Sequence, residues 1–399
     1  MVFAGGSYLL ARQLKGSDVI VNTVTIARHS AAAPTASATT ITGAVGIFSP
    51  GRTSYNISIG SGLGIAPLDP GFGTTDRAVL TVVGEGTTTH VENIEVEKWS
   101  MQAFAVHGTA GESPAPPLID SSLTLAGPVI SGWIRNTSNR LLQDVTLDVG
   151  NDTVGLQSLA PGEQRNVRLV LSGSVAPVSG GPGRPLPRTA GGNTGDDNAQ
   201  QALLESVVNS GIPMPGGYSE AGGLVGGARI LAFSDVAPFP VDVQGQRIQQ
   251  HNTTLELLPV EVHLPPTGYT LPYGLARREV LQDSGVANQF GGPGLPLGST
   301  AVFQFHLPGN ATGLTWNALH VRLNFGAPSR PGVGSGPSVA LYNWQAAAWE
   351  AQPGLPQGVF SVPQPGRYID PRGLIRLQLS GGTGKEVLQT LDVALDGPP

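Results

Sequence analysis

The sequence predicts an all-β protein made of several β-sandwich domains, immunoglobulin-like and jelly-roll-like, with one short helix. Short runs of β-branched and other apolar residues alternate with polar residues, as in half-buried strands. Turn-forming residues separate these runs, and the chain holds 56 glycines and 34 prolines. Its 399 residues exceed what one hydrophobic core usually supports, so we expect several domains.

Residues 18–107 are expected to form the first β-sandwich domain. The alternating run at 18–28 predicts its first strand, and a long strand is predicted at 91–104. The alternation slips by one position near Lys98, which indicates a β-bulge. Shorter strands are predicted at 39–48, 54–59 and 78–83.

Residues 1–17, before this domain, hold an apolar run at 1–11 that is followed by Arg12 and Lys15. A membrane-spanning helix needs ~20 apolar residues, so this run is too short to cross a bilayer. A signal peptide carries its basic residues before the apolar run, not after it. We interpret 1–17 as the stub of a membrane helix, which would give the chain an N-terminal membrane anchor; a buried first segment is the alternative.

Residues 118–175 are predicted to form an immunoglobulin-like domain, because short strands follow one another at close spacing. Its strands are predicted at 129–136, 141–149 and 153–159, with a closing strand in which Val167, Leu169 and Leu171 alternate. The chain has no cysteine, so Trp133 is expected to pack on aliphatic side chains rather than on a disulfide.

Residues 176–197 are a Gly/Pro-rich linker, and residues 198–265 are expected to bridge to the last domain with a helix and strands. The helix is predicted at 198–210, since aspartates precede it and Gly211 follows it. Pro259 confines the last strand of the segment to a sheet edge or a bulge. The bridging strands are predicted at 228–233, 240–243 and 254–264.

Residues 266–399 are predicted to form a jelly-roll-like β-sandwich. Trp344 and Trp349 stand on either side of a predicted hairpin turn at 345–348. The strands are predicted at 301–307, 318–324, 339–344, 374–379 and 387–395.

Composition and motifs argue against most kinds of chemistry. Without cysteine there is no disulfide and no thiolate metal site, and a net charge of −6 disfavours nucleic acid as a partner. Ser219 lacks the last glycine of a hydrolase elbow, and Gly384-Lys385 does not complete a phosphate-binding loop. The seven histidines form no metal-binding motif. We therefore expect no catalytic residue, no metal and no cofactor.

Aromatic residues of the last domain supply the one candidate binding site. Tyr342, Trp344 and Trp349 could form a carbohydrate-stacking platform, although packing into the core is the favoured interpretation. Glu92, Glu95 and Glu97 are interpreted as the solvated side of a strand. A glycosidase carboxylate pair would leave no spacing signal, because such pairs meet only in three dimensions.

Five Asn-x-Ser/Thr triplets are potential glycosylation sites. A chain rich in Thr, Ser and Asn produces such triplets by chance, so the sequence leaves their glycosylation open. They begin at Asn56, Asn136, Asn151, Asn252 and Asn310.

Several short segments, in this order, resemble the C-terminal extracytoplasmic β-domain region of a family of large uncharacterised bacterial multi-span membrane proteins. The resemblance covers nearly the whole chain, and it implies that residues 1–11 end a membrane helix and that no catalytic residue carries over. The segments are 14–22 (LKGSDVIVN), 99–102 (WSMQ), 135–138 (RNTS), 159–163 (LAPGE), 231–235 (LAFSD), 341–345 (LYNWQ) and 367–371 (RYIDP).

Three functions remain, and we rank them. The first is a non-enzymatic extracytoplasmic scaffold or interaction subunit of a cell-surface or membrane-associated assembly, with other protein subunits as partners. The second is a carbohydrate-binding protein that uses the aromatics of the C-terminal sandwich, with glycans as partners. The third is a glycan-active enzyme, which needs two carboxylates about 5–10 Å apart in a cleft.

Overall fold

The computed structural model describes fifteen stretches of the chain, and strands β1 to β27 in them form five sheets. The all-β prediction is confirmed. Of the predicted helix at 198–210, the four described residues, 200, 201, 203 and 204, are helical. The described stretches are 18–29, 37–60, 62–67, 81–85, 88–113, 117–150, 152–173, 200–201, 203–204, 225–283, 295–296, 300–326, 338–352, 358–380 and 387–398. Residues 1–17 and 176–197 lie outside them.

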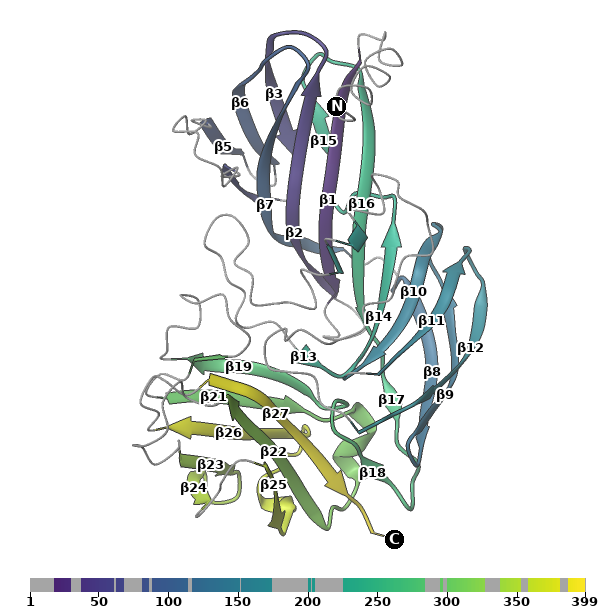
Figure 1. The fold of residues 1–399 in the computed structure, drawn as a ribbon, viewed down its shortest axis with the longest axis vertical. Helices are drawn as coiled ribbons and strands as arrows, with labels where there is room; N and C mark the ends of the chain where they lie inside the picture. The colour runs from purple at the N-terminus through teal and green to yellow at the C-terminus, as the bar shows by residue number, and fades with distance from the viewer. Residues whose placement is uncertain are drawn as a thin grey trace.

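An eight-stranded sheet runs through the upper and middle parts of the molecule (Figure 1). Its central strand β16 pairs in parallel with β1 on one side and antiparallel with β14 on the other. In sheet order the strands are β11 (Asp152–Leu159), β10 (Leu142–Val149), β14 (Ala228–Ser234), β16 (Ile248–Pro259), β1 (Val19–His29), β2 (Ser37–Ser49), β7 (Ser100–Ser113) and β4 (Gly64–Pro67).

Two smaller sheets provide the second layers of two sandwiches that share this long sheet. Side chains such as Val21, Ile47 and Ile57 fill the core of the first sandwich, and Ile134, Leu147 and Ile230 belong to the core of the second. The small sheet of the first sandwich consists of β15 (Val241–Val243), β3 (Thr53–Ile59), β6 (Thr88–Val96) and β5 (Thr81–Glu85). The small sheet of the second sandwich consists of β12 (Gln164–Val170), β9 (Val129–Asn136), β8 (Ile119–Ala126) and β17 (Val262–His263).

The third sandwich contains the C-terminal strands and lies at the bottom of Figure 1. Its core is continuous with that of the second sandwich. One sheet, in order, is β13 (Val225–Gly226), β19 (Arg277–Asp283), β21 (Thr300–His306), β26 (Leu374–Ser380), β23 (Ser338–Asn343) and β24 (Ala348–Gln352). The other is β18 (Thr270–Leu271), β27 (Val387–Asp396), β22 (Ala318–Gly326) and β25 (Gly358–Pro363), with β20 (Leu295–Pro296) also paired to β27. The described 3-10 helices are η1 (Gly309–Gly313) and η2 (Pro365–Arg367).

Strand pairing crosses the segments that the sequence suggested as separate. The eight-stranded sheet takes strands from 18–107, from 118–175 and from 198–265. Residues 198–265, which were expected to bridge two domains, supply β14 and β16 to this sheet. They also supply β15 to the small sheet of the first sandwich and β17 to the small sheet of the second sandwich. Their strands thus connect the first two sandwiches.

Three local predictions are wrong. Trp133 does not pack into the aliphatic core: its neighbour Ile134 is buried there, so Trp133 projects from the outer face of β9, beside Arg135. The phase slip near Lys98 is a turn rather than a bulge: β6 ends at Val96, β7 begins at Ser100, and the two strands belong to different sheets. Trp99 takes a left-handed φ of 61° in that turn. Pro259 lies in a central strand rather than an edge strand, but it is the last residue of β16, beyond the final pair with β1 at Leu257. Its missing N–H therefore removes no bond to β1.

Gly132 in β9 tests how closely these strands approach. It has a φ of 148°, and a Cβ atom there would lie 1.9 Å from the backbone oxygen of Ser122 on β8. We predict that Gly132→Ala lowers the free energy of unfolding by about 2 kcal/mol or more, measured by urea denaturation. Gly155→Ala is the matched control, because a Cβ in that strand would meet nothing within 4 Å. Equal stability of the two variants would contradict the prediction.

Candidate functional site

The three aromatic residues singled out in the sequence lie together at the end of the third sandwich. Tyr342 of β23 and Trp349 of β24 are directly paired, with ring centroids 5.2 Å apart. The ring of Trp344, in the turn after β23, lies 4.9 Å from that of Tyr342. The two strands and the turn form the predicted hairpin. Their role in carbohydrate binding remains a prediction.

These rings do not form a flat platform. Tyr342 meets Trp344 at 78° and Trp349 at 72°, so both contacts are edge-to-face. Trp344 is fixed, because its indole Nε1 donates to the carbonyl of Leu374 over 3.1 Å. Trp349 is 38% exposed, which makes it the most accessible of the three aromatic residues.

A row of polar side chains, missed in the sequence, continues this face across the sheet. The guanidinium of Arg376 in β26 lies 4.8 Å from the ring centroid of Trp344. Its Nε donates to Gln304 Oε1 of β21 over 2.9 Å. Further along, His306 Nε2 lies 3.1 Å from Glu279 Oε2 of β19. A usable signal was present, since polar residues occupy the outward positions of strands whose inward positions hold Phe and Leu.

The hairpin is held by residues of the two separated segments LYNWQ and RYIDP. Glu350 accepts from Asn343 Nδ2 over 2.7 Å and from the Tyr368 hydroxyl over 2.6 Å. These hydrogen bonds lower the pKa of Glu350, and the one from Tyr368 is the larger cause. The backbone N–H of Trp344 donates to the carbonyl of Arg367 over 2.8 Å. The two segments therefore form one unit, which fixes the positions of the aromatic rings.

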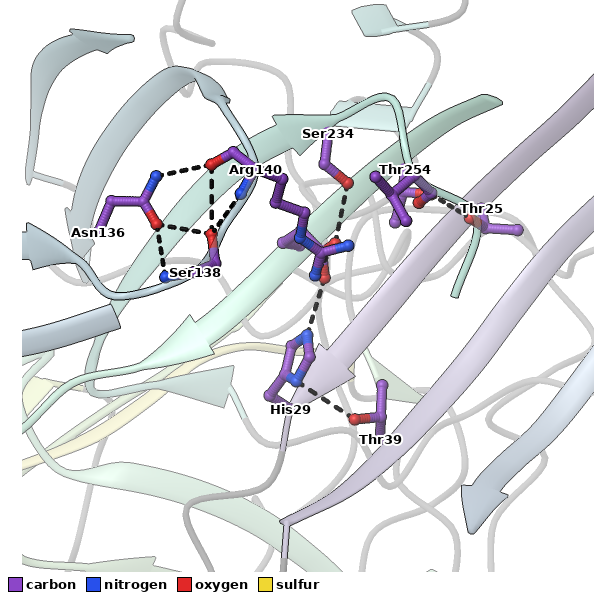
Figure 2. Close-up of polar contacts among 10 residues, drawn as sticks. Thr25, His29, Thr39, Asn136, Ser138, Arg140, Ser234 and Thr254 are labelled. Atoms are coloured by element: carbon purple, nitrogen blue, oxygen red, sulfur yellow. Dashed lines mark hydrogen bonds and ion pairs between the residues drawn. The ribbon is translucent and has the colours of Figure 1, made fainter. Parts of the chain in front are cut away.

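A second candidate is a buried carboxylate at the junction of the first two sandwiches. Glu256 of β16 is 1% exposed. One carboxylate oxygen lies 2.8 Å from His29 Nε2; the other lies 3.0 Å from Arg140 Nη2 and accepts from the Ser234 hydroxyl over 3.0 Å. Figure 2 shows His29, Arg140 and Ser234 converging on this point from β1, from the β9–β10 connection and from β14. Both oxygens of the carboxylate thus have protein partners.

The chain Thr39–His29–Glu256 has the order of a hydroxyl–imidazole–carboxylate triad, with Thr39 Oγ1 3.2 Å from His29 Nδ1. Thr39 and His29 are, however, direct cross-strand partners in β2 and β1. Side chains in such a position meet for structural reasons alone. We interpret the cluster as a structural junction in which the carboxylate compensates Arg140.

Asn136 holds the segment that carries Arg140. It is fully buried, and its Nδ2 donates to the carbonyls of Arg140 over 2.8 Å and Leu159 over 2.9 Å. Its Oδ1 accepts from the N–H of Ser138 over 2.9 Å. The segments RNTS and LAPGE therefore meet at this amide. An amide buried and bonded in this way cannot carry a glycan in the folded protein.

A third buried group is Asp392 of β27. It accepts from the N–H groups of Gly274 and Val393, each over 2.7 Å, and is 7% exposed. Burial is the main cause that raises its pKa to about 6, although Arg278 and both hydrogen bonds act in the opposite direction. Arg278 itself donates to the carbonyl of Leu391. The cluster ties β27 to the segment between β18 and β19.

Within the described stretches, no three His, Asp or Glu side chains converge as metal ligands would. No helix in the same part of the chain is both long and apolar enough to span a membrane.

Replacing Glu256 tests the junction. Glu256→Gln leaves Arg140 and His29 without their carboxylate, so we expect the free energy of unfolding to fall by about 3 kcal/mol in urea denaturation. Asp120→Asn is the control, because Asp120 pairs with Arg135 at the surface over 2.8 Å. That change is expected to lower stability by about 1 kcal/mol or less. A similar small effect of both substitutions would refute the structural role of Glu256.

Asp392 predicts a pH dependence. Its folded pKa of about 6 lies above the ordinary 3.8, so the folded protein binds the proton more tightly than the unfolded chain. The resulting stabilisation is complete below pH 4 and is lost as the pH rises through 6; its size is up to about 3 kcal/mol. The stability difference between wild type and Asp392→Asn, followed by urea denaturation from pH 4 to 7, should shift against wild type as the pH rises. A pH-independent difference would contradict the assignment.

Comparisons with known proteins name no function. Residues 118–263 match the family described as "Domain of unknown function (DUF8725)", and residues 270–397 match "Domain of unknown function (DUF8815)". The first match runs from the start of β8 to the end of β17, and the second from β18 to β27. No curated protein matches the chain.

Similar solved structures include two mu-homology domains with bound peptides. One is the Fcho1 domain of Danio rerio with an Eps15 peptide, at 9% identity and a TM-score of 0.30, covering 62% of this chain and 95% of that one. The other is the yeast delta-COP-I domain with a Dsl1 WxWxV peptide, at 5% identity and a TM-score of 0.29, covering 62% and 98%. At such low TM-scores, neither likeness supports an argument about fold or function.

Proposed function

We propose that this chain is a non-enzymatic extracytoplasmic scaffold, an interaction subunit of a cell-surface or membrane-associated assembly. The observation that carries the proposal is that the three sandwiches are joined into one continuous framework. The first two sandwiches share an eight-stranded sheet, and the second and third share a core. Such a frame holds its surfaces at fixed separations, which is what a scaffold requires.

The use of the buried ionisable groups supports a role without catalysis. Glu256 has partners on both oxygens, and Asp392 accepts two backbone hydrogen bonds. Both connect strands or segments distant in the sequence. A catalytic carboxylate needs an oxygen that can reach a substrate.

The extracytoplasmic setting and the membrane anchor rest on the family resemblance. The resembling segments include the start of β1 and the turn before β7. Residues 1–17, which we propose as the membrane-helix stub, precede β1 in the sequence and lie outside the described residues. On this proposal the partners are other protein subunits, and nucleic acid is not among them.

Exposed apolar side chains near the start of β7 offer a surface for a protein partner. Met101 is 57% exposed and Trp99 43%, and the ring of Trp99 lies 6.1 Å from that of Phe48 in β2. Large apolar side chains exposed side by side are typical of interaction sites. Aromatic residues and methionine are also enriched in interfaces.

Carbohydrate binding is the second candidate function, favoured by the exposed indole of Trp349 beside Tyr342. A glycan-active enzyme ranks third. Hydrolysis of a polysaccharide by the purified chain would overturn the non-enzymatic proposal.

Fractionation of native cells tests the scaffold. We expect the chain in a detergent-extracted complex, with the same partner proteins recovered in each preparation. The double variant Trp99→Ser, Met101→Glu should lose these partners, whereas Val359→Glu, at a 56% exposed position of the third sandwich, should keep them. Thermal unfolding of each variant controls for folding. Recovery of the wild-type chain as a free monomer would sink the proposal.

A further inference from the structure

The outer face of the sheet that contains β26, β23 and β24 carries a row of side chains in register. The inward residues Leu377 and Leu341 are paired and fully buried, so Arg376 and Tyr342, next to them in sequence, project from the opposite face. Tyr342 is paired with Trp349 on β24. Figure 1 shows β26, β23 and β24 side by side in this order. Neighbouring strands lie ~4.8 Å apart, so Arg376 and Trp349 are separated by ~10 Å across the row.

The three side chains have binding capacity that the described protein does not use. Arg376 forms no ion pair with a described carboxylate; the partners of its guanidinium are the neutral Gln304 and the ring of Trp344. The Tyr342 hydroxyl makes no hydrogen bond within the described residues, and it is not among the buried unsatisfied atoms. Trp349 is 38% exposed.

A second arginine–tryptophan pair in the chain shows the contrast. Arg135 lies 5.8 Å from the ring of Trp133, but its Nη2 also pairs with Asp120 over 2.8 Å. That guanidinium is neutralised within the protein. Among the described residues, no carboxylate pairs with Arg376 in this way, in a chain whose net charge is −6.

We propose that this row, Arg376–Tyr342–Trp349, binds an acidic polysaccharide. The sugar chain runs across the strands, one ring stacks on the indole of Trp349, and a carboxylate or sulfate of a neighbouring sugar binds Arg376. The Tyr342 hydroxyl, between them, bonds to a sugar hydroxyl. The anion supplies the charge that Arg376 lacks, and an exposed indole suits the apolar face of a pyranose.

The inference gives the predicted aromatic residues different roles. Trp344 positions Arg376, because its indole N–H is already bonded to Leu374 and its ring lies beside the guanidinium. Gln304 holds the Nε of Arg376 from the other side. Tyr342 and Trp349 contact the ligand. This proposal refines the carbohydrate-binding candidate and does not depend on the scaffold proposal.

Binding to immobilised polygalacturonate, alginate and heparin tests the proposal, with neutral dextran and poly-glutamate as comparison ligands. We expect wild type to bind at least one acidic polysaccharide, more weakly as salt increases. Arg376→Gln and Trp349→Ala should each weaken this binding tenfold or more, and Tyr342→Phe severalfold. Arg376→Lys should retain part of it.

Arg135→Gln and Trp99→Ala are the matched controls, since they remove an arginine and an exposed tryptophan elsewhere, and both should bind like wild type. Thermal unfolding of every variant checks its fold, and Tyr342→Phe keeps the test valid if another variant unfolds. The proposal is overturned if wild type binds none of the three acidic polysaccharides, or if the row variants bind like wild type. Equal binding of poly-glutamate with the same variant dependence would show an acidic peptide site instead. The cell-fractionation experiment with Arg376→Gln separates this result from the scaffold proposal, which predicts unchanged partners.

Discussion

The placement of β16 between β1 and β14 is the constraint on which the rest of the structure depends. Thr25 of β1 and Thr254 of β16 share a buried hydrogen bond of 2.9 Å although they are 229 residues apart. Without this parallel pairing, the strands β1, β2, β7 and β4 would have no connection to β14, β10 and β11 within the sheet. Parallel neighbours so distant in sequence are slow to meet during folding, because their loop must close before the contact stabilises anything. The first sandwich therefore depends on a strand made late in the chain.

The same strand explains why a charged cluster lies inside the protein. One face of the long sheet holds the first core beside Val21 and, further along, the second core beside Leu258. Glu256 lies between these two cores, where the small sheet of the first sandwich gives way to that of the second. Arg140 reaches it from the connection between β9 and β10. Burying an ion without partners is very unfavourable, so a shift of β16 against β1 and β14 that separated Glu256 from His29 and Ser234 would be disfavoured. We regard the cluster as a device that fixes register at the junction, at the expense of some stability.

Local patterns predicted much of the fold, and long-range pairing explains what they missed. The strand predicted at 129–136 is β9 with the same limits, and the turn between Trp344 and Trp349 is present. The turn at 97–99 was mistaken for a bulge because a change of sheet and a bulge shift the alternation alike. In the sequence, Glu256 is an ordinary polar position in an alternating run. No local pattern indicates that its partners in the sheet, Ala27 and Ala232, are both buried. For Arg376 and Gln304 the alternation indicated an outward position, but it could not show that the two side chains meet, since their contact joins residues 72 positions apart.

The two arginine–tryptophan pairs show how similar local chemistry leads to different roles. A guanidinium beside an indole gains attraction from the ring, but this gain is small at an exposed position, ~0.5–1 kcal/mol, and leaves the charge itself in place. Asp120 compensates that charge at Arg135, so an anion would have to compete with this carboxylate. At Arg376 the partner is an amide oxygen, which orients the guanidinium without neutralising it. An oriented charge loses less freedom when an anion binds, so the second arrangement favours a ligand where the first favours only the fold.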